Sequence, residues 1–136
     1  MKAADVLRSI RDTIEALEPF DQATPQDRFH GAISMDPAAT LDRTFSVGSS
    51  LPTRNTDYID ASEYVMTVAI AIAYMDGEAA HDRILNDAEQ VVEALFEMGS
   101  ELGFTIEPIP EGVIHPGPAA GTLIASRMFR LRYTMG

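Results

Sequence analysis

Three histidines, His30, His81 and His115, are the side chains best suited to acid–base chemistry or metal binding in this sequence. None of them forms a His-x-x-x-His pair or has the neighbouring glutamate of a zinc-peptidase helix. His81 and Asp82 follow Asp76 and Glu78 at the expected start of a helix, where such a group could bind a metal. A solvated cluster on a helix surface accounts for these residues equally well, and we assign no metal site to them.

Other catalytic and cofactor motifs are missing. The Gly-Ser-Ser at residues 48–50 lacks the Gly-x-Ser-x-Gly pattern of a nucleophile elbow. Prolines and apolar residues separate the glycines of residues 112–121, and no Lys-Ser or Lys-Thr follows them as in a phosphate-binding loop. The chain has no cysteine, which excludes thiolate chemistry and disulfides. We therefore expect no catalytic residue and no cofactor, and a protein that is not an enzyme.

The charge is strongly negative, because 21 acidic residues face 10 basic ones and leave a formal net charge of −11. This field opposes binding to nucleic acids and to anionic membranes. Residues 76–101 contain eight acids and a single base. A candidate acidic face recurs there at helical spacing and consists of Asp82, Glu89, Glu93 and Glu97. Such a face is typical of a solvated helix surface, but it would also suit a partner bearing arginine or a surface that must repel DNA.

Hydrophobic periodicity defines the elements that must position these residues within a single domain, residues 1–136. A three- and four-residue period predicts helices over residues 3–18 and 78–98, the second capped by Gly99. Alternation predicts strands over residues 28–35, 43–47, 63–75, 104–106 and 122–135. The longest apolar run, residues 65–75, is too short to span a bilayer as a helix, so no membrane association is expected.

The predicted order is α-β-β-β-α-β-β, and it lacks the repeated strand–helix–strand units of a doubly wound fold. We expect an α+β fold with a mostly antiparallel or mixed sheet and two helices packed on one of its faces. Residues 63–75 are apolar on both sides, which is typical of a central strand. One of these sides carries only small residues such as Ala69, Ala71 and Ala73, so another element can approach it closely.

Two predicted loops, residues 48–57 and 107–121, are long for so small a domain. The second contains Ile109, Val113 and Ile114, which are unfavourable in water. These three residues either fold back onto the domain or dock on a neighbouring subunit.

The whole-chain layout resembles the tail-terminator proteins of long-tailed bacteriophages. The resemblance lies in an N-terminal helix closed by Glu18-Pro19, short strands around residues 29–33, and a loop leading into the long strand at residues 64–74. An acidic helix at residues 84–98 and a closing strand at residues 129–133 complete it. It covers nearly the entire chain but rests on element order, because the family has no short diagnostic motif.

The resemblance implies a structural virion protein that forms a ring, usually a hexamer, at the end of the tail tube. Such a ring contacts the tail-tube protein and the head-side connector or stopper protein, and DNA passes through its lumen without specific binding. The implied location is the tail or neck of the virion, after assembly in the host cytoplasm. As a hypothesis, the subunit interface uses both long loops, with the basic residues meeting a neighbour's acidic helix. The candidate interface residues are Arg54, Asp57, Ile109, Val113, Ile114, Arg130 and Arg132.

Two alternatives remain. A head-closure or adaptor protein of the same neck would have a similar small α+β texture. A small dimeric ligand-binding or enzymatic α+β domain belongs to a different class, and a deep pocket lined by His81, Asp82 and Tyr74 would favour it.

Overall fold

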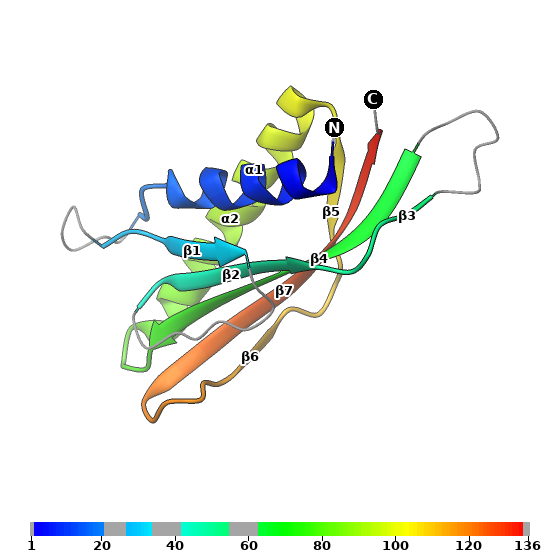
Figure 1. Ribbon diagram of the computed structural model, residues 1–136. Helices are drawn as coiled ribbons and strands as arrows, with labels where there is room; N and C mark the ends of the chain where they lie inside the picture. Colours follow the sequence, from blue (N-terminus) through cyan, green and yellow to red (C-terminus); the bar gives the residue numbers. More distant parts are fainter. Residues whose placement is uncertain (1, 21–26, 34–41, 55–62, 135–136) are drawn as a thin grey trace.

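The computed structural model of the chain describes residues 2–20, 27–33, 42–54 and 63–134. Two helices and seven strands form these parts (Figure 1), and the α+β class confirms the sequence-based prediction. The helices are α1 (Ala3–Glu15) and α2 (Ala80–Leu102). The strands are β1 (His30–Ile33), β2 (Thr44–Ser49), β3 (Thr53–Arg54), β4 (Glu63–Met75), β5 (Thr105–Pro108), β6 (Val113–Pro116) and β7 (Thr122–Thr134).

The two long strands β4 and β7 form the centre of the sheet. They pair antiparallel along their whole length, from Glu63 opposite Thr134 to Met75 opposite Thr122. β2 and β3 pair with the outer side of β4, while β5 and β6 pair with the outer side of β7. β1 runs parallel to β2, and the other pairs are antiparallel, so the sheet is mixed.

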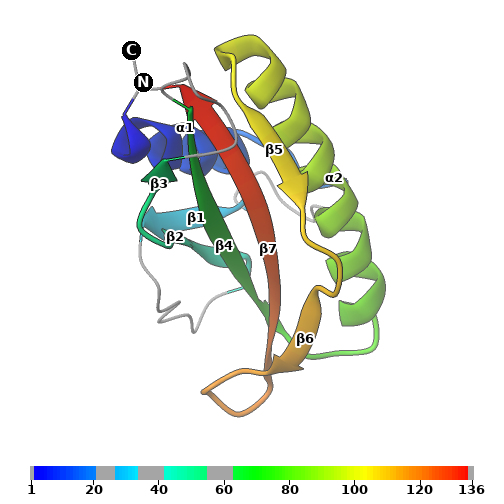
Figure 2. The ribbon, with the colours of Figure 1, turned by 90° about the vertical axis from the view of Figure 1, so that its right-hand side faces the viewer.

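Both helices cover the same face of this sheet. α1 buries Val6, Ile10 and Ile14 at three- and four-residue steps, and α2 buries Ile84, Val91 and Leu95 in the same way. These side chains share one core with the strand residues that face them, such as Val68, Phe129 and Leu131. Neither helix crosses in front of β4 or β7 in Figure 2. Within the described parts, no helix is long and apolar enough to cross a membrane.

Both helices end elsewhere than predicted. α1 ends at Glu15 instead of residue 18, because the next turn tightens and the Leu17 N–H donates to the Ile14 carbonyl oxygen. α2 continues past Gly99 to Leu102 and is capped by Gly103, whose φ of 85° is left-handed. Gly99 serves packing instead, since a Cβ there would lie 2.7 Å from the Phe104 carbonyl oxygen.

The two predicted loops each contain a strand, which corrects the sequence-based prediction. β3 lies within residues 48–57 and β6 within residues 107–121. Strands of two and four residues carry too little alternation to be recognised, and the long strands β4 and β7 supply their hydrogen-bonding partners. The prolines of β5 and β6 are compatible with edge positions, where one side of the strand needs no N–H donor. Residues 34 and 35, predicted to end the first strand, lie outside the described residues.

Candidate functional site

The face of the sheet opposite the helices is lined by small and basic side chains. Ala69 pairs with Met128 and Ala71 with Ser126 on this face, which we call the open face. Arg130 and Arg132 lie on it too, opposite Thr67 and Val65. Met128 is 48% exposed. A surface of short side chains beside an exposed methionine and two arginines allows another molecule to approach the backbone closely.

The predicted interface residue Arg54 does not share this face. It lies in β3 opposite Tyr64, which belongs to the helix-covered side of the sheet. Tyr64 stacks on Tyr133 there, with ring centroids 5.9 Å apart. The structure therefore groups Arg130 with Arg132 and separates Arg54 from both, while Asp57 lies outside the described residues.

On the helix-covered side, α2 and β6 border a groove of about 210 Å³, which we call the α2–β6 groove. Leu85, Ala88 and Val92 of α2 form one wall and Val113 and Ile114 of β6 form the other. The floor comes from Ile70, Ile72, Ala125, Arg127 and Phe129 of β4 and β7.

The three apolar residues of the predicted loop, Ile109, Val113 and Ile114, differ in their exposure to solvent. Val113 and Ile114 remain exposed, at 53% and 39%; the register places Ile114 on the groove side, opposite Ala125, and Val113 on the open-face side, opposite Ser126. Ile109 is half-buried, and its N–H donates to the Met128 carbonyl oxygen at 2.8 Å. Ile109 therefore fixes the connection between β5 and β6, whereas Val113 and Ile114 are available to a partner.

Arg127 lies in the floor of the α2–β6 groove. It pairs in register with Ile70 on the core side of β7, where its neighbours along the strand are Ala125 and Phe129. Its Nε atom is buried and has no hydrogen-bond partner among the described residues. Glu89 and Glu93 of α2 lie at the mouth beside it. Neither forms an ion pair with Arg127, and its buried Nε–H has no acceptor among the described residues, as is also the case for Arg132 Nε.

The structure places the four residues of the predicted acidic face on α2. Asp82, Glu89, Glu93 and Glu97 are all exposed on α2, and only Glu89 and Glu93 border the α2–β6 groove. Asp87 was counted among the acids of this segment, but its side chain is 1% exposed and points into the core. Its position could have been recognised, because it follows Ile84 by three residues and precedes Val91 by four, on the apolar stripe of the helix.

Asp87 is part of a buried charge network that the sequence did not reveal. Arg43 is fully buried and donates from Nε and Nη2 to the two carboxylate oxygens of Asp87, at 2.8 and 3.0 Å. Its Nη1 lies 3.0 Å from Asp27 Oδ1. The Tyr74 hydroxyl donates to Asp87 Oδ2 at 2.9 Å. Burial, followed by the charge of Asp87, raises the pKa of the Tyr74 phenol far above its usual range.

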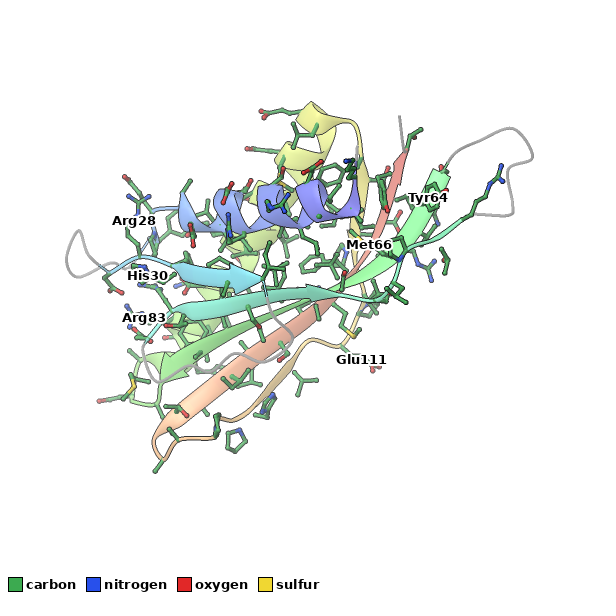
Figure 3. All side chains as sticks on the ribbon, viewed as in Figure 1. Arg28, His30, Tyr64, Met66, Arg83 and Glu111 are labelled. Atoms are coloured by element: carbon green, nitrogen blue, oxygen red, sulfur yellow. The ribbon has the colours of Figure 1, made fainter. Side chains whose placement is uncertain are left out.

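Arg83 connects this network to the surface of α2. Its Nη2 lies 2.5 Å from Asp27 Oδ2, and its Nη1 donates to Asp42 Oδ2. Asp42 Oδ1 in turn accepts the Met75 N–H at 3.1 Å. Figure 3 shows Arg83 at one end of the sheet and Tyr64 at the other. The network thus joins α2, β4 and the segments before β1 and β2 at a single end of the molecule.

The backbone of Arg43 is equally constrained. Its φ of 60° is left-handed, which is uncommon for a residue other than glycine. The Arg43 N–H donates to the Ala73 carbonyl oxygen at 2.7 Å, and its carbonyl oxygen accepts the His30 N–H at 3.0 Å. The guanidinium lies over the Phe29 ring, 5.6 Å from its centroid. The backbone and the guanidinium of Arg43 are therefore both bound within the chain, and we interpret the network as a structural clamp that holds α2 to the sheet.

The residues of the proposed ligand pocket, His81, Asp82 and Tyr74, do not come together. His81 and Asp82 are exposed in the first turn of α2. Tyr74 is buried, and its hydroxyl is bonded to Asp87. Tyr74 instead contributes to the α2–β6 groove, which His81 and Asp82 do not line.

No protein-family model matches the sequence, and no curated protein is detectably similar to it.

Proposed function

We propose that this chain is a tail-terminator protein of a long-tailed bacteriophage. In this role its subunits form a ring, a hexamer by the family resemblance, at the end of the tail tube. The ring joins the tube protein to the head-side connector, and DNA passes through its lumen. The observation that carries the proposal is the open face, a long two-stranded surface of small and basic residues that neither helix covers.

The charge supports this role. A ring multiplies the formal charge of −11 per subunit, so its combined field repels DNA. A lumen that DNA must traverse benefits from such repulsion, because attraction would retard the passage. The exposed acids of α2 and the two arginines of the open face lie on opposite sides of the sheet. A subunit with one acidic and one basic side can contact a basic surface of one neighbour and an acidic surface of another.

Locating the chain in the virus particle tests the proposal. Antibodies against the purified protein would be applied to particles produced by cells that carry the encoding viral genome, and labels would be located by electron microscopy. We expect labels at the junction between head and tail. Deleting the gene should yield tail tubes longer than normal that do not join heads, because the growing tube has no cap. Labels on the head shell or at the distal tail tip would contradict the proposal.

A head-closure or adaptor protein of the same neck is the nearest alternative. The open face and the acidic α2 would suit a ring at that position as well. The deletion separates the two functions, since loss of an adaptor leaves tails of normal length.

The α2–β6 groove favours a second candidate function, a small dimeric ligand-binding domain. Its apolar walls and its volume of about 210 Å³ would suit a small apolar ligand. A strict dimer in light scattering over a concentration series, combined with saturable binding of a naphthalene-sulfonate dye, would support this candidate. A larger ring-shaped assembly under the same conditions would count against it.

A further inference from the structure

We propose that the α2–β6 groove of one subunit binds the open face of a second copy of this chain. This inference rests on the proposed function and specifies how its subunits would meet. It concerns two surfaces that lie on opposite sides of the same sheet. The part of the open face around Met128 and Arg130 is exposed, whereas its other end, at Ala73 and Ile124, is buried.

The charges of the two surfaces are complementary. The mouth of the groove carries Glu89 and Glu93, and the open face carries Arg130 and Arg132. Glu89 and Glu93 are one helical turn apart, about 6 Å along the axis. Arg130 and Arg132 are two strand residues apart, about 7 Å. The two pairs can therefore face each other in register, as two glutamate–arginine ion pairs.

A third charge pair fits the same arrangement with the opposite polarity. Arg127 brings a positive charge and an unsatisfied buried Nε to the groove. On the open face, Glu107 of β5 is exposed and lies opposite Arg130 in the register. None of these side chains forms an ion pair within the described residues. A neighbour's Glu107 would supply the acceptor that Arg127 lacks.

Apolar side chains surround these charges on both surfaces. Leu85 and Ile114 at the groove are 48% and 39% exposed, and Met128 on the open face is 48% exposed. Met128 is a flexible side chain that can adapt to the irregular groove between α2 and β6. Burying these residues between two copies removes apolar surface from water, which is the main favourable contribution to association.

The contact is heterologous because it joins two different surfaces. Each subunit in such a contact retains one free groove and one free face, so association continues until a ring closes or a filament forms. An isologous dimer would instead use the same surface twice. This distinction makes the proposal testable with pairs of variants.

The test uses two charge-reversal variants that should assemble only with each other. The variant Glu89→Arg/Glu93→Arg has arginines on both surfaces, and the variant Arg130→Glu/Arg132→Glu has glutamates on both. We expect each to be monomeric in light scattering, with association weakened at least about a hundredfold, because like charges then face each other. Mixed in equal amounts, they should regain the mass of the wild-type assembly with strictly alternating subunits.

Two controls separate assembly from folding. The variant Glu78→Arg/Glu101→Arg makes the same charge change on exposed positions at the two ends of this helical segment, outside the groove, and should assemble like the wild type. The variant Ala88→Phe fills the groove without changing any charge and should also dissociate the assembly. Circular-dichroism melting of every variant confirms that a monomer is folded.

Three results would overturn the proposal. One is a wild-type chain that remains monomeric over the whole concentration series. Another is an assembly that neither the reversed pairs nor Ala88→Phe weakens. The third is a groove that binds an apolar dye equally well in monomer and assembly, which would assign it to a small ligand. None of these decides the proposed function, because labelling of the virus particle tests that independently.

Discussion

Arg43 and Arg127 both bring a guanidinium to the apolar interior, and their surroundings differ completely. Arg43 is fully buried, paired with Asp87 and Asp27, and stacked over Phe29. Arg127 is half-buried in an apolar groove. Its buried Nε–H finds no hydrogen-bond acceptor among the described residues. The glutamates near it remain at the mouth of the groove and form no ion pair with it.

This difference distinguishes an arginine that stabilises the fold from one that lies at a surface groove. A buried charge persists in a stable fold when it is paired with opposite charges, as Arg43 is with the carboxylates of Asp87 and Asp27. A charge left incomplete beside exposed apolar side chains stabilises the isolated domain little. Its position in a groove with exposed walls is the observation behind the proposed contact with a second copy of the chain. The predictions below test whether the two arginines differ in this way.

The largest effect is expected when Arg43 loses its main partner. Replacing Asp87 by alanine leaves a buried guanidinium without its bidentate carboxylate, which costs about 3–5 kcal/mol of unfolding free energy. Urea unfolding measures this loss directly. The matched control is Glu97→Ala, on the same helix, exposed and outside the groove, which should change stability by no more than about 0.5 kcal/mol. Similar small effects for both variants would show that the network is not a clamp.

A smaller loss is expected from Tyr74→Phe. The variant removes one hydrogen bond to the Asp87 carboxylate and should cost about 1.5 kcal/mol, while Arg43 still satisfies Asp87. Tyr64→Phe is the control, since Tyr64 stacks on Tyr133 and donates no hydrogen bond from its hydroxyl among the described residues. Equal unfolding free energies for the two variants would contradict the role of Tyr74 in the network.

The same variant has a predicted pH signature. Because the pKa of Tyr74 is raised in the folded chain, the phenol stays neutral there while it ionises in the unfolded chain above about pH 10. Its contribution is complete below that pH and decreases as the pH rises further. Wild type should therefore lose more stability than Tyr74→Phe between pH 9 and pH 11, as measured by urea unfolding at each pH. Parallel losses would show that Tyr74 ionises normally.

The smallest effect on stability is expected at Arg127. Replacing it by methionine keeps the length of the side chain and removes an unsatisfied polar group, so stability should change by less than about 1 kcal/mol, towards stabilisation. Arg43→Met is the direct counterpart and should cost about 3–5 kcal/mol, because it leaves Asp87 buried without its arginine. Equal losses in thermal or urea unfolding would remove the distinction between the two arginines.

The fold could be predicted from the sequence because its periodicities are local. Val6, Ile10 and Ile14 recur at helical spacing, and β4 and β7 alternate over thirteen residues each, long enough to be unambiguous. The short strands β3 and β6 were missed because two to four residues carry no detectable period. The helix end at Gly103 was missed for a related reason. Either Gly99 or Gly103 could cap a helix by its residue type, and only the tertiary structure shows that Gly99 packs against Phe104 while Gly103 caps the helix.

The candidate surfaces were only partly predictable. Alternation along residues 122–135 is enough to place Arg130 and Arg132 on the side of β7 opposite Leu131, and helical spacing places Glu89 and Glu93 on the exposed side of α2. The groove between α2 and β6 was not predictable, because its walls come from segments that are distant in the sequence. Arg54 was grouped with the strand arginines, but the pairing of β3 with β4 places it on the other side of the sheet.

The sequence by itself determined the α+β class, the two amphipathic helices, the long central strands and the acidic character of the chain. These properties depend on residues that are near one another in the sequence or on simple composition. Only the tertiary structure decided which charges are buried in ion pairs and which lack such a partner. Arg43 and Asp87 are separated by 44 residues, and their pairing depends on how α2 packs against the sheet, which no local pattern encodes.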